Sequence, residues 1–165
     1  MRKGTLVLGM LGALLTGYSS AGETVLYDDL EPRGNVIYHN EEPYTGIFLD
    51  KDSQGRVRAQ GHLEAGLLQG EVITYDIHGK VMKSVSYVNG KPDGTSTTFY
   101  EDGSIEEKGR YEAGEPEGKW VSYYPGGAIE RISYLKNGHP EGEWTYFNED
   151  GSVKEKRTYK NGQRQ

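Results

Sequence analysis

Histidines and carboxylates are the side chains of this sequence that could bind a metal ion or transfer protons. The histidines are His39, His62, His78 and His139, and no two share a position in the 24-residue repeat described below. A metal site needs ligands that converge. No serine has the Gly-x-Ser-x-Gly context of a nucleophile elbow, and the chain has no cysteine. The sequence therefore predicts no catalytic residue, no metal site and no cofactor.

Acidic residues gather where turns are expected, and clustered carboxylates could bind calcium. The repeat lacks the nonapeptide glycine-aspartate pattern of calcium-binding β-rolls. Aspartate is also common in turns because its side chain hydrogen-bonds to the nearby backbone. We therefore interpret these acids as turn formers; they are Glu101, Asp102, Glu149 and Asp150, with Asp28, Asp29, Asp50 and Asp52 nearer the N-terminus.

Aromatic side chains are the strongest candidates for binding. Tyr100, Trp120, Tyr124 and Trp144 are expected on the strand face opposite Tyr123 and Phe147. If one face packs, the other stays partly exposed, and its rings could stack on sugars or on apolar side chains of a protein. The alternative is that sheet curvature and long side chains cover both faces.

A 24-residue repeat positions these rings. Three glycine columns step by 24 residues without insertion or deletion. They are Gly46, Gly70, Gly94, Gly118 and Gly142; Gly55, Gly79, Gly103, Gly127 and Gly151; and Gly66, Gly90, Gly114, Gly138 and Gly162. Glycine adopts the positive φ of tight turns without steric cost, so two of these columns predict turns that alternate with short strands.

Apolar residues recur at the same period. One column is β-branched and contains Val57, Val81, Ile105, Ile129 and Val153. Another is aromatic after its first member and contains Lys51, Tyr75, Phe99, Tyr123 and Phe147. Alternation with period two is typical of strands. We predict an all-β fold, an elongated single-layer antiparallel meander of tandem β-hairpins. Tyr134 lies one residue early in its column, which predicts a local bulge or a shifted turn.

The repeat divides the chain into segments. A signal peptide at 1–21 and a cap or half repeat at 22–45 precede five repeats at 46–69, 70–93, 94–117, 118–141 and 142–165. The first full repeat has Lys51 in the aromatic column and Leu63 in the tyrosine column, so we expect residues 24–45 to shield it. Stacked hairpins share hydrogen-bond ladders that a single hairpin lacks.

The first 21 residues resemble a secretory signal peptide. Arg2 and Lys3 precede an uncharged apolar run at 5–17, and Ser19 and Ala21 fit the −3 and −1 positions of a cleavage site. Cleavage after Ala21 predicts a protein of the periplasm or the medium. The alternative is an uncleaved N-terminal anchor.

The net charge and the absence of cysteine limit the kinds of partner and of membrane attachment that we expect. Tyr18 stands where a lipobox would have its cysteine, so no lipid anchor is expected. Loss of Arg2 and Lys3 would change the net charge from −6 to −8. This argues against nucleic acid and anionic lipid as main partners. We expect a protein partner, or alternatively a glycan, and no stable membrane insertion after cleavage.

The pattern Tyr111-x-x-Gly114-x-x-x-Gly118-x-Trp120-x-x-Tyr123 resembles the MORN repeat, and its bacterial variant most closely. Proteins with that variant include the YwqK-type antitoxins. The resemblance covers roughly residues 29–165 and implies an extended antiparallel sheet with a scaffolding or binding role and no catalytic residues. A signal peptide does not suit an antitoxin that acts on a cytoplasmic toxin.

Two functional hypotheses follow from the repeat and the aromatic residues. The first is a non-enzymatic protein-interaction scaffold, which docks or neutralises a partner through the aromatic face or an exposed sheet edge. The second is a carbohydrate or cell-wall binding module that uses the aromatic rows.

Overall fold

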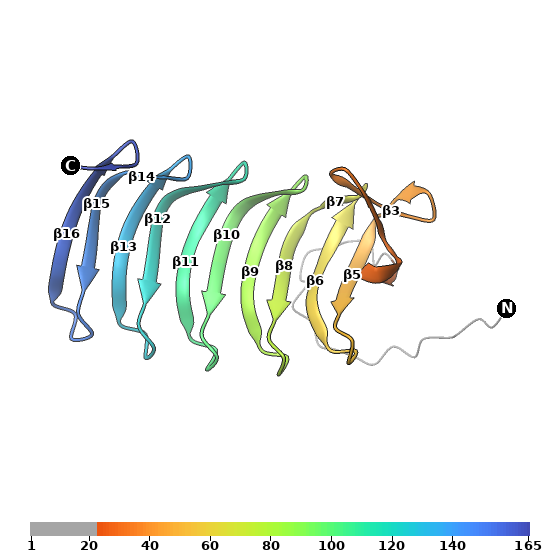
Figure 1. Ribbon diagram of the computed structural model, residues 1–165, viewed down its shortest axis with the longest axis horizontal. Helices are drawn as coiled ribbons and strands as arrows, with labels where there is room; N and C mark the ends of the chain where they lie inside the picture. Colours follow the sequence, from red (N-terminus) through yellow and green to blue (C-terminus); the bar gives the residue numbers. More distant parts are fainter. Residues whose placement is uncertain (1–22) are drawn as a thin grey trace.

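The computed structural model describes residues 23–165, which form a long antiparallel sheet of successive hairpins (Figure 1). Strands make up 66% of these residues, and the helical structure in this range is the short 3₁₀ turn η1 (Tyr27–Asp29). The predicted all-β class and hairpin meander are therefore confirmed. The predicted signal peptide lies outside the described residues.

The main sheet follows the order of the chain from β5 onward, so each strand pairs with its neighbours in sequence. Its central strands are β5 (Gly46–Lys51), β6 (Val57–Glu64), β8 (Gly70–Tyr75), β9 (Val81–Val88), β10 (Lys91–Phe99), β11 (Ile105–Glu112), β12 (Glu115–Tyr123), β13 (Ile129–Lys136), β15 (Gly142–Phe147) and β16 (Val153–Lys160). Shorter strands complete it: β1 (Thr24–Leu26), β7 (Leu67–Leu68), β14 (His139–Pro140) and β17 (Gln163–Arg164).

One register irregularity recurs in every hairpin. The pairing shifts by one residue just before the turn, at Lys51, Tyr75, Phe99, Tyr123 and Phe147. The local bulge or shifted turn predicted at Tyr134 is absent from the pairing of β13 with β12. Leu135 pairs with Gly118 as Tyr111 pairs with Gly94, so leucine replaces tyrosine without a change of register.

Hydrogen bonds between turns join each repeat to the one before it. Each turn glycine donates its N–H to a carbonyl 22 residues earlier over 2.7–3.0 Å: Gly66 to Tyr44, Gly90 to Leu68, Gly114 to Pro92, Gly138 to Pro116, and Gly162 to Pro140. The N–H of the preceding residue donates to a side-chain oxygen 20 residues earlier over 2.8–3.2 Å: Ala65 to Thr45, Asn89 to Gln69, Ala113 to Asp93, Asn137 to Glu117, and Asn161 to Glu141. Two bonds per repeat thus fix the stacking.

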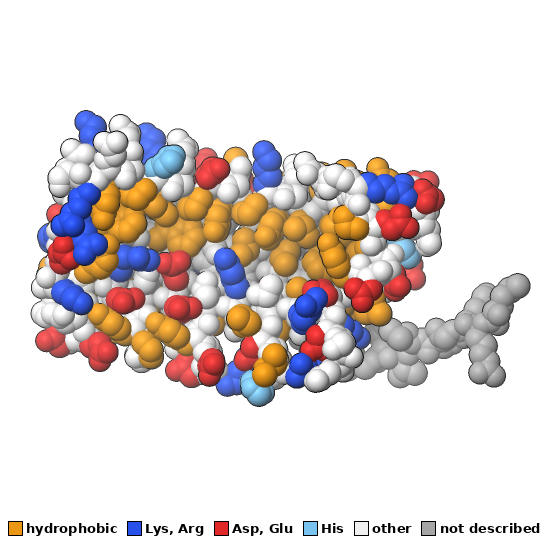
Figure 2. Space-filling view, in the orientation of Figure 1, with side chains coloured by type: hydrophobic (Ala, Val, Ile, Leu, Met, Phe, Trp, Pro, Cys, Tyr) orange, Lys and Arg blue, Asp and Glu red, His pale blue; other side chains and the backbone are white. Residues whose placement is uncertain are grey.

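The tryptophan face is the broad side of the sheet that carries Trp120 and Trp144. Its side chains pack against the neighbouring strands of the same sheet. A Cβ built on Gly109 would lie 2.1 Å from the ring of Trp120, so the indole lies directly on the backbone of the neighbouring strand. Tyr111 meets Trp120 edge-on at a centroid distance of 5.4 Å. A band of hydrophobic side chains crosses successive strands along the long axis (Figure 2).

The most buried core lies at the N-terminal end. β1 pairs with β5 in parallel, and a small second sheet forms from β2 (Glu31–Arg33), β3 (Val36–His39) and β4 (Glu42–Pro43). Leu63 is fully buried, and it clusters with Val25, Leu30, Tyr44 and Phe48. Residues 24–45 therefore cover the first full repeat, in which Leu63 stands in the tyrosine column.

Replacement of Gly109 by alanine tests the contact beneath Trp120. The added methyl would force the indole off the strand, and we expect a loss of about 1–3 kcal/mol in the free energy of unfolding. Urea unfolding followed by tryptophan fluorescence measures it, with Glu106→Ala on the same strand as the control. Equal stability of the two variants would contradict the packing described.

Candidate interaction site at the hairpin turns

Tyr100 and Tyr124 join neighbouring repeats. Each follows the last residue of a strand and lies in a turn, which corrects their predicted place on a strand face. The Tyr100 hydroxyl donates to the carbonyl of Tyr123 over 2.5 Å, and the Tyr124 hydroxyl donates to that of Phe147 over 2.9 Å. Their polar ends are thus engaged within the sheet.

The two tryptophans are also largely covered. Trp120 is 7% exposed, so its ring offers no stacking surface, contrary to the expectation of an exposed row. Trp144 is partly buried. Its Nε1 donates to the carbonyl of Tyr134 over 2.9 Å. The ring of Tyr159 packs on it with a distance of 4.8 Å between ring centroids, and the Arg131 guanidinium lies 5.6 Å from its ring centroid. The structure brings the four predicted residues into internal contacts rather than into one open surface.

The opposite side of the sheet carries a second set of rings. We call Tyr75, Phe99, Tyr123 and Phe147 the aromatic row; all four are partly buried. Beside them runs the aliphatic row of Val57, Val81, Ile105, Ile129 and Val153, whose last three members are exposed. Both rows coincide with the repeating columns of the sequence.

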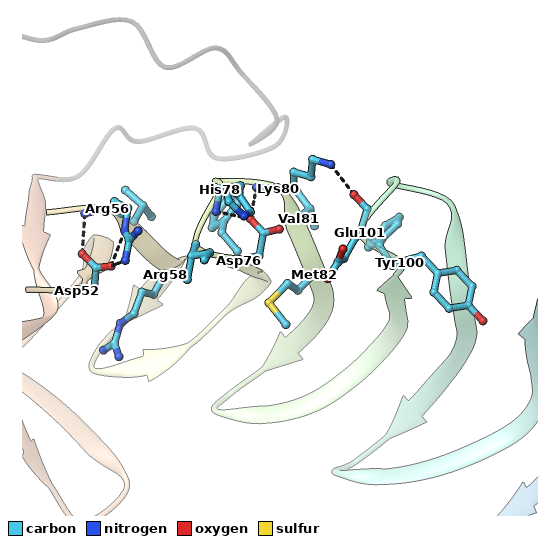
Figure 3. A pocket seen from close by; sticks show the side chains of 14 residues that line it. Asp52, Arg56, Arg58, Asp76, His78, Lys80, Val81, Met82, Tyr100 and Glu101 are labelled. Carbon is cyan, nitrogen blue, oxygen red and sulfur yellow. Dashed lines mark hydrogen bonds and ion pairs between the residues drawn. The ribbon is translucent and has the colours of Figure 1, made fainter. Parts of the chain in front are cut away.

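A groove of about 440 Å³ lies at the turns of the first three hairpins (Figure 3). Val57, Val81, Tyr75 and Phe99 contribute its apolar lining, and Tyr100 lies at one end. Ile77 and Met82 also line it, with 64% and 49% of their surfaces exposed. Exposed apolar side chains beside an apolar hollow are typical of a surface that binds another macromolecule.

Several charged side chains around the groove form ion pairs or hydrogen bonds with their neighbours. Arg56 forms an ion pair with Asp52 at 2.6 Å, and Lys80 donates through Nζ to the carbonyl of Glu101 over 2.7 Å (Figure 3). Asp76 accepts the backbone N–H of Lys80, and this bond lowers the pKa of its carboxyl. These contacts hold the rim side chains in place around an apolar lining, so the groove is suited to apolar side chains more than to a small ion.

A difference between repeats explains why the groove lies here. Asp52 and Asp76 occupy the column in which the next two repeats have Tyr100 and Tyr124. The aspartates bind their own turns, whereas the tyrosines reach across to the following repeat. Short side chains therefore leave the space between turns open in the first repeats, and tyrosines occupy it in the later ones.

The histidines do not gather around the groove. His78 lines it, but His62 is buried at 6% exposure in β6, and His39 packs edge-on against Tyr44. Across residues 23–165 no three histidine, aspartate or glutamate side chains converge as metal ligands. In the same range no helix has the length and apolarity needed to cross a bilayer.

A family model described as the MORN repeat variant matches residues 92–113, 116–137 and 140–161. The chain thus carries three tandem repeats of this kind, in the register of β10–β16. No curated protein matches the chain. Most of the groove is built by residues 52–82, which precede the matched repeats, so the groove coincides with the hairpins that diverge from the pattern.

Removal of the Tyr124 hydroxyl tests its structural role. Tyr124→Phe keeps the ring but loses the bond to the Phe147 carbonyl, so we expect a loss of about 1 kcal/mol in unfolding free energy. Hydrogen exchange should quicken in β15 and β16. Tyr134→Phe is the control, because this ring is 42% exposed. If Tyr124→Phe leaves both stability and exchange unchanged, the hydroxyl does not join the repeats.

Proposed function

We propose that this protein is a non-enzymatic protein-interaction scaffold, and that the groove at its first three hairpin turns docks apolar side chains of a partner protein. The observation that carries the proposal is an apolar hollow rimmed by the exposed Ile77 and Met82. MORN repeats often serve as modules for protein or membrane interaction, which supports this role.

The antitoxin resemblance suggests what such docking would do. A partner held across the turns would have part of its own surface covered, and neutralisation would follow if that surface were its active one. The signal-peptide pattern at 1–21 favours a partner outside the cytoplasm. A carbohydrate ligand is the alternative, and the half-buried ring of Trp144 is the best remaining platform for it.

A graft between two turns of this chain tests the groove. The segment Tyr-Glu-Asp-Gly-Ser of residues 100–104 replaces Asp76-Ile-His-Gly-Lys80, so that the new tyrosine reaches the carbonyl of Phe99 and fills the hollow. A photo-crosslinking residue at Met82 should give one discrete protein adduct in cells, and the graft should abolish it. The loss is expected because the apolar anchor of the partner no longer fits.

Two controls accompany the graft. Asn148→Tyr places the same ring in the last turn and should leave the Met82 adduct unchanged, and a crosslinker at Lys136 should give no matching adduct. The proposal fails if the graft retains the adduct while thermal unfolding shows it folded. Glycan-array binding that Trp144→Ala abolishes, without any protein adduct, would establish the carbohydrate function instead.

Export is tested on the chain itself. We expect the mature protein to begin at Gly22, because Ser19 and Ala21 fit the cleavage site. Intact-mass measurement of protein from the periplasmic or secreted fraction checks this. Substitution of Ala21 by a bulky residue should slow processing, while Gly22→Ala serves as a control. A product that keeps residues 1–21 would contradict cleavage.

A further inference from the structure

We propose that the aromatic row binds a proline-rich segment of the partner in the polyproline II conformation, lying across the strands. This inference rests on the proposed function, since it names the partner chemistry that the turn end of the sheet accepts. Its basis is the geometry of Tyr75, Phe99, Tyr123 and Phe147, which lie on β8, β10, β12 and β15.

The spacing of the row matches the pitch of that helix. Consecutive members are separated by one intervening strand, so at about 4.8 Å per strand they repeat every ~9.6 Å. A polyproline II helix has three residues per turn and rises about 3.1 Å per residue, which repeats every ~9.3 Å. A segment with proline at every third position would therefore present the same side to each successive ring.

Hollows lie along the row where such a segment would sit. The 440 Å³ groove contains Tyr75 and Phe99, and a smaller hollow beside it contains Tyr75 with Val57 and Ile77. A third hollow contains Tyr123 and Val121. Proline-rich ligands bind in grooves lined by aromatic side chains because their stiff backbone loses little entropy on binding.

Two hydroxyls of the row have no hydrogen-bond partner within residues 23–165, namely those of Tyr75 and Tyr123. Burial, with a further contribution from the charge of Glu71, raises the pKa of Tyr75, so its hydroxyl is protonated at neutral pH and available as a donor. A polyproline II backbone makes no internal hydrogen bonds and leaves its carbonyls open. Each tyrosine could thus donate to one carbonyl of the segment, six residues apart.

Positively charged side chains near Tyr123 indicate where acidic residues of the segment would lie. Lys108 and Lys119 line the hollow at Tyr123, and neither has an acidic partner within the described part of the chain. Arg110, which also lines it, has one ion-pair contact in that part, to Glu112 at 4.0 Å. Three neighbouring cations on β11 and β12 repel one another, so glutamates placed over Tyr123 would be attracted.

The test uses a synthetic fluorescein-labelled 12-residue peptide with proline at every third position and glutamates between the prolines of one half. A control peptide of identical composition has its prolines at every second position. We expect the first to bind the full chain at least about tenfold more tightly by fluorescence anisotropy. Amide chemical shifts should change at the aromatic row and not around Trp120. Equal affinity, or shifts confined elsewhere, would overturn the proposal.

Conservative variants separate binding from folding. Tyr75→Phe and Tyr123→Phe keep the rings, and each should weaken peptide binding by about fivefold without a change in thermal stability. Lys119→Glu should weaken binding of the acidic peptide by a similar factor, whereas Lys136→Glu at the opposite turn should not. Unchanged affinity in the two row variants and in Lys119→Glu would show that the peptide binds elsewhere.

The crosslinking experiment distinguishes the two levels of inference. A Met82 adduct that the turn graft abolishes, together with no preference for the three-residue proline period, leaves the scaffold function standing and rejects the proline-rich partner. If neither the Met82 adduct nor the preference for the three-residue proline period is found, both the scaffold function and the proline-rich partner are rejected.

Discussion

The turn ladder is the interaction on which the rest of this structure depends. A glycine N–H that donates to a carbonyl 22 residues earlier joins each repeat to the preceding one, and a side-chain oxygen supports the same turn. Both bonds require positive φ, as at Asn89 and Gly90 with values of 49° and 79°. Because every repeat uses the same two bonds, an insertion within a strand would displace the donors from their acceptors and disturb the stacking.

Because the bonded glycine turns are spaced evenly along the sheet, the hairpin turns at the opposite end of the strands are spaced evenly too. The recurring bulge before each turn places one aromatic side chain per repeat at the same height, which produces the row of Tyr75, Phe99, Tyr123 and Phe147. A globular core would rarely hold rings at such a period. A sheet without a second layer does so because each hairpin contacts its immediate neighbours and little else.

The glycine columns were sufficient to predict the hairpins, their turns and the all-β class, because turn conformation is a local property of glycine and asparagine. Burial was harder to predict. Trp120 is covered because Gly109, across the strand pair, lets the ring lie on the backbone, and that contact depends on register rather than on the tryptophan itself. Tyr100 was misplaced for a related reason, since its hydroxyl finds a carbonyl in the next repeat.

The groove shows how a repeat protein can acquire a site without a new element. A tyrosine in the turn column bridges to the next repeat, and an aspartate in the same column stabilises its own turn instead, so either residue satisfies the local fold. Either residue therefore allows the hairpin to form, and the choice between them determines whether the space between turns is filled. Where Asp52 and Asp76 stand, the space between turns remains open, and the adjoining aromatic row continues from it along the sheet at a fixed step. The regular repeats thus set the spacing of the aromatic row, and the divergent first repeats form the groove at one end of it.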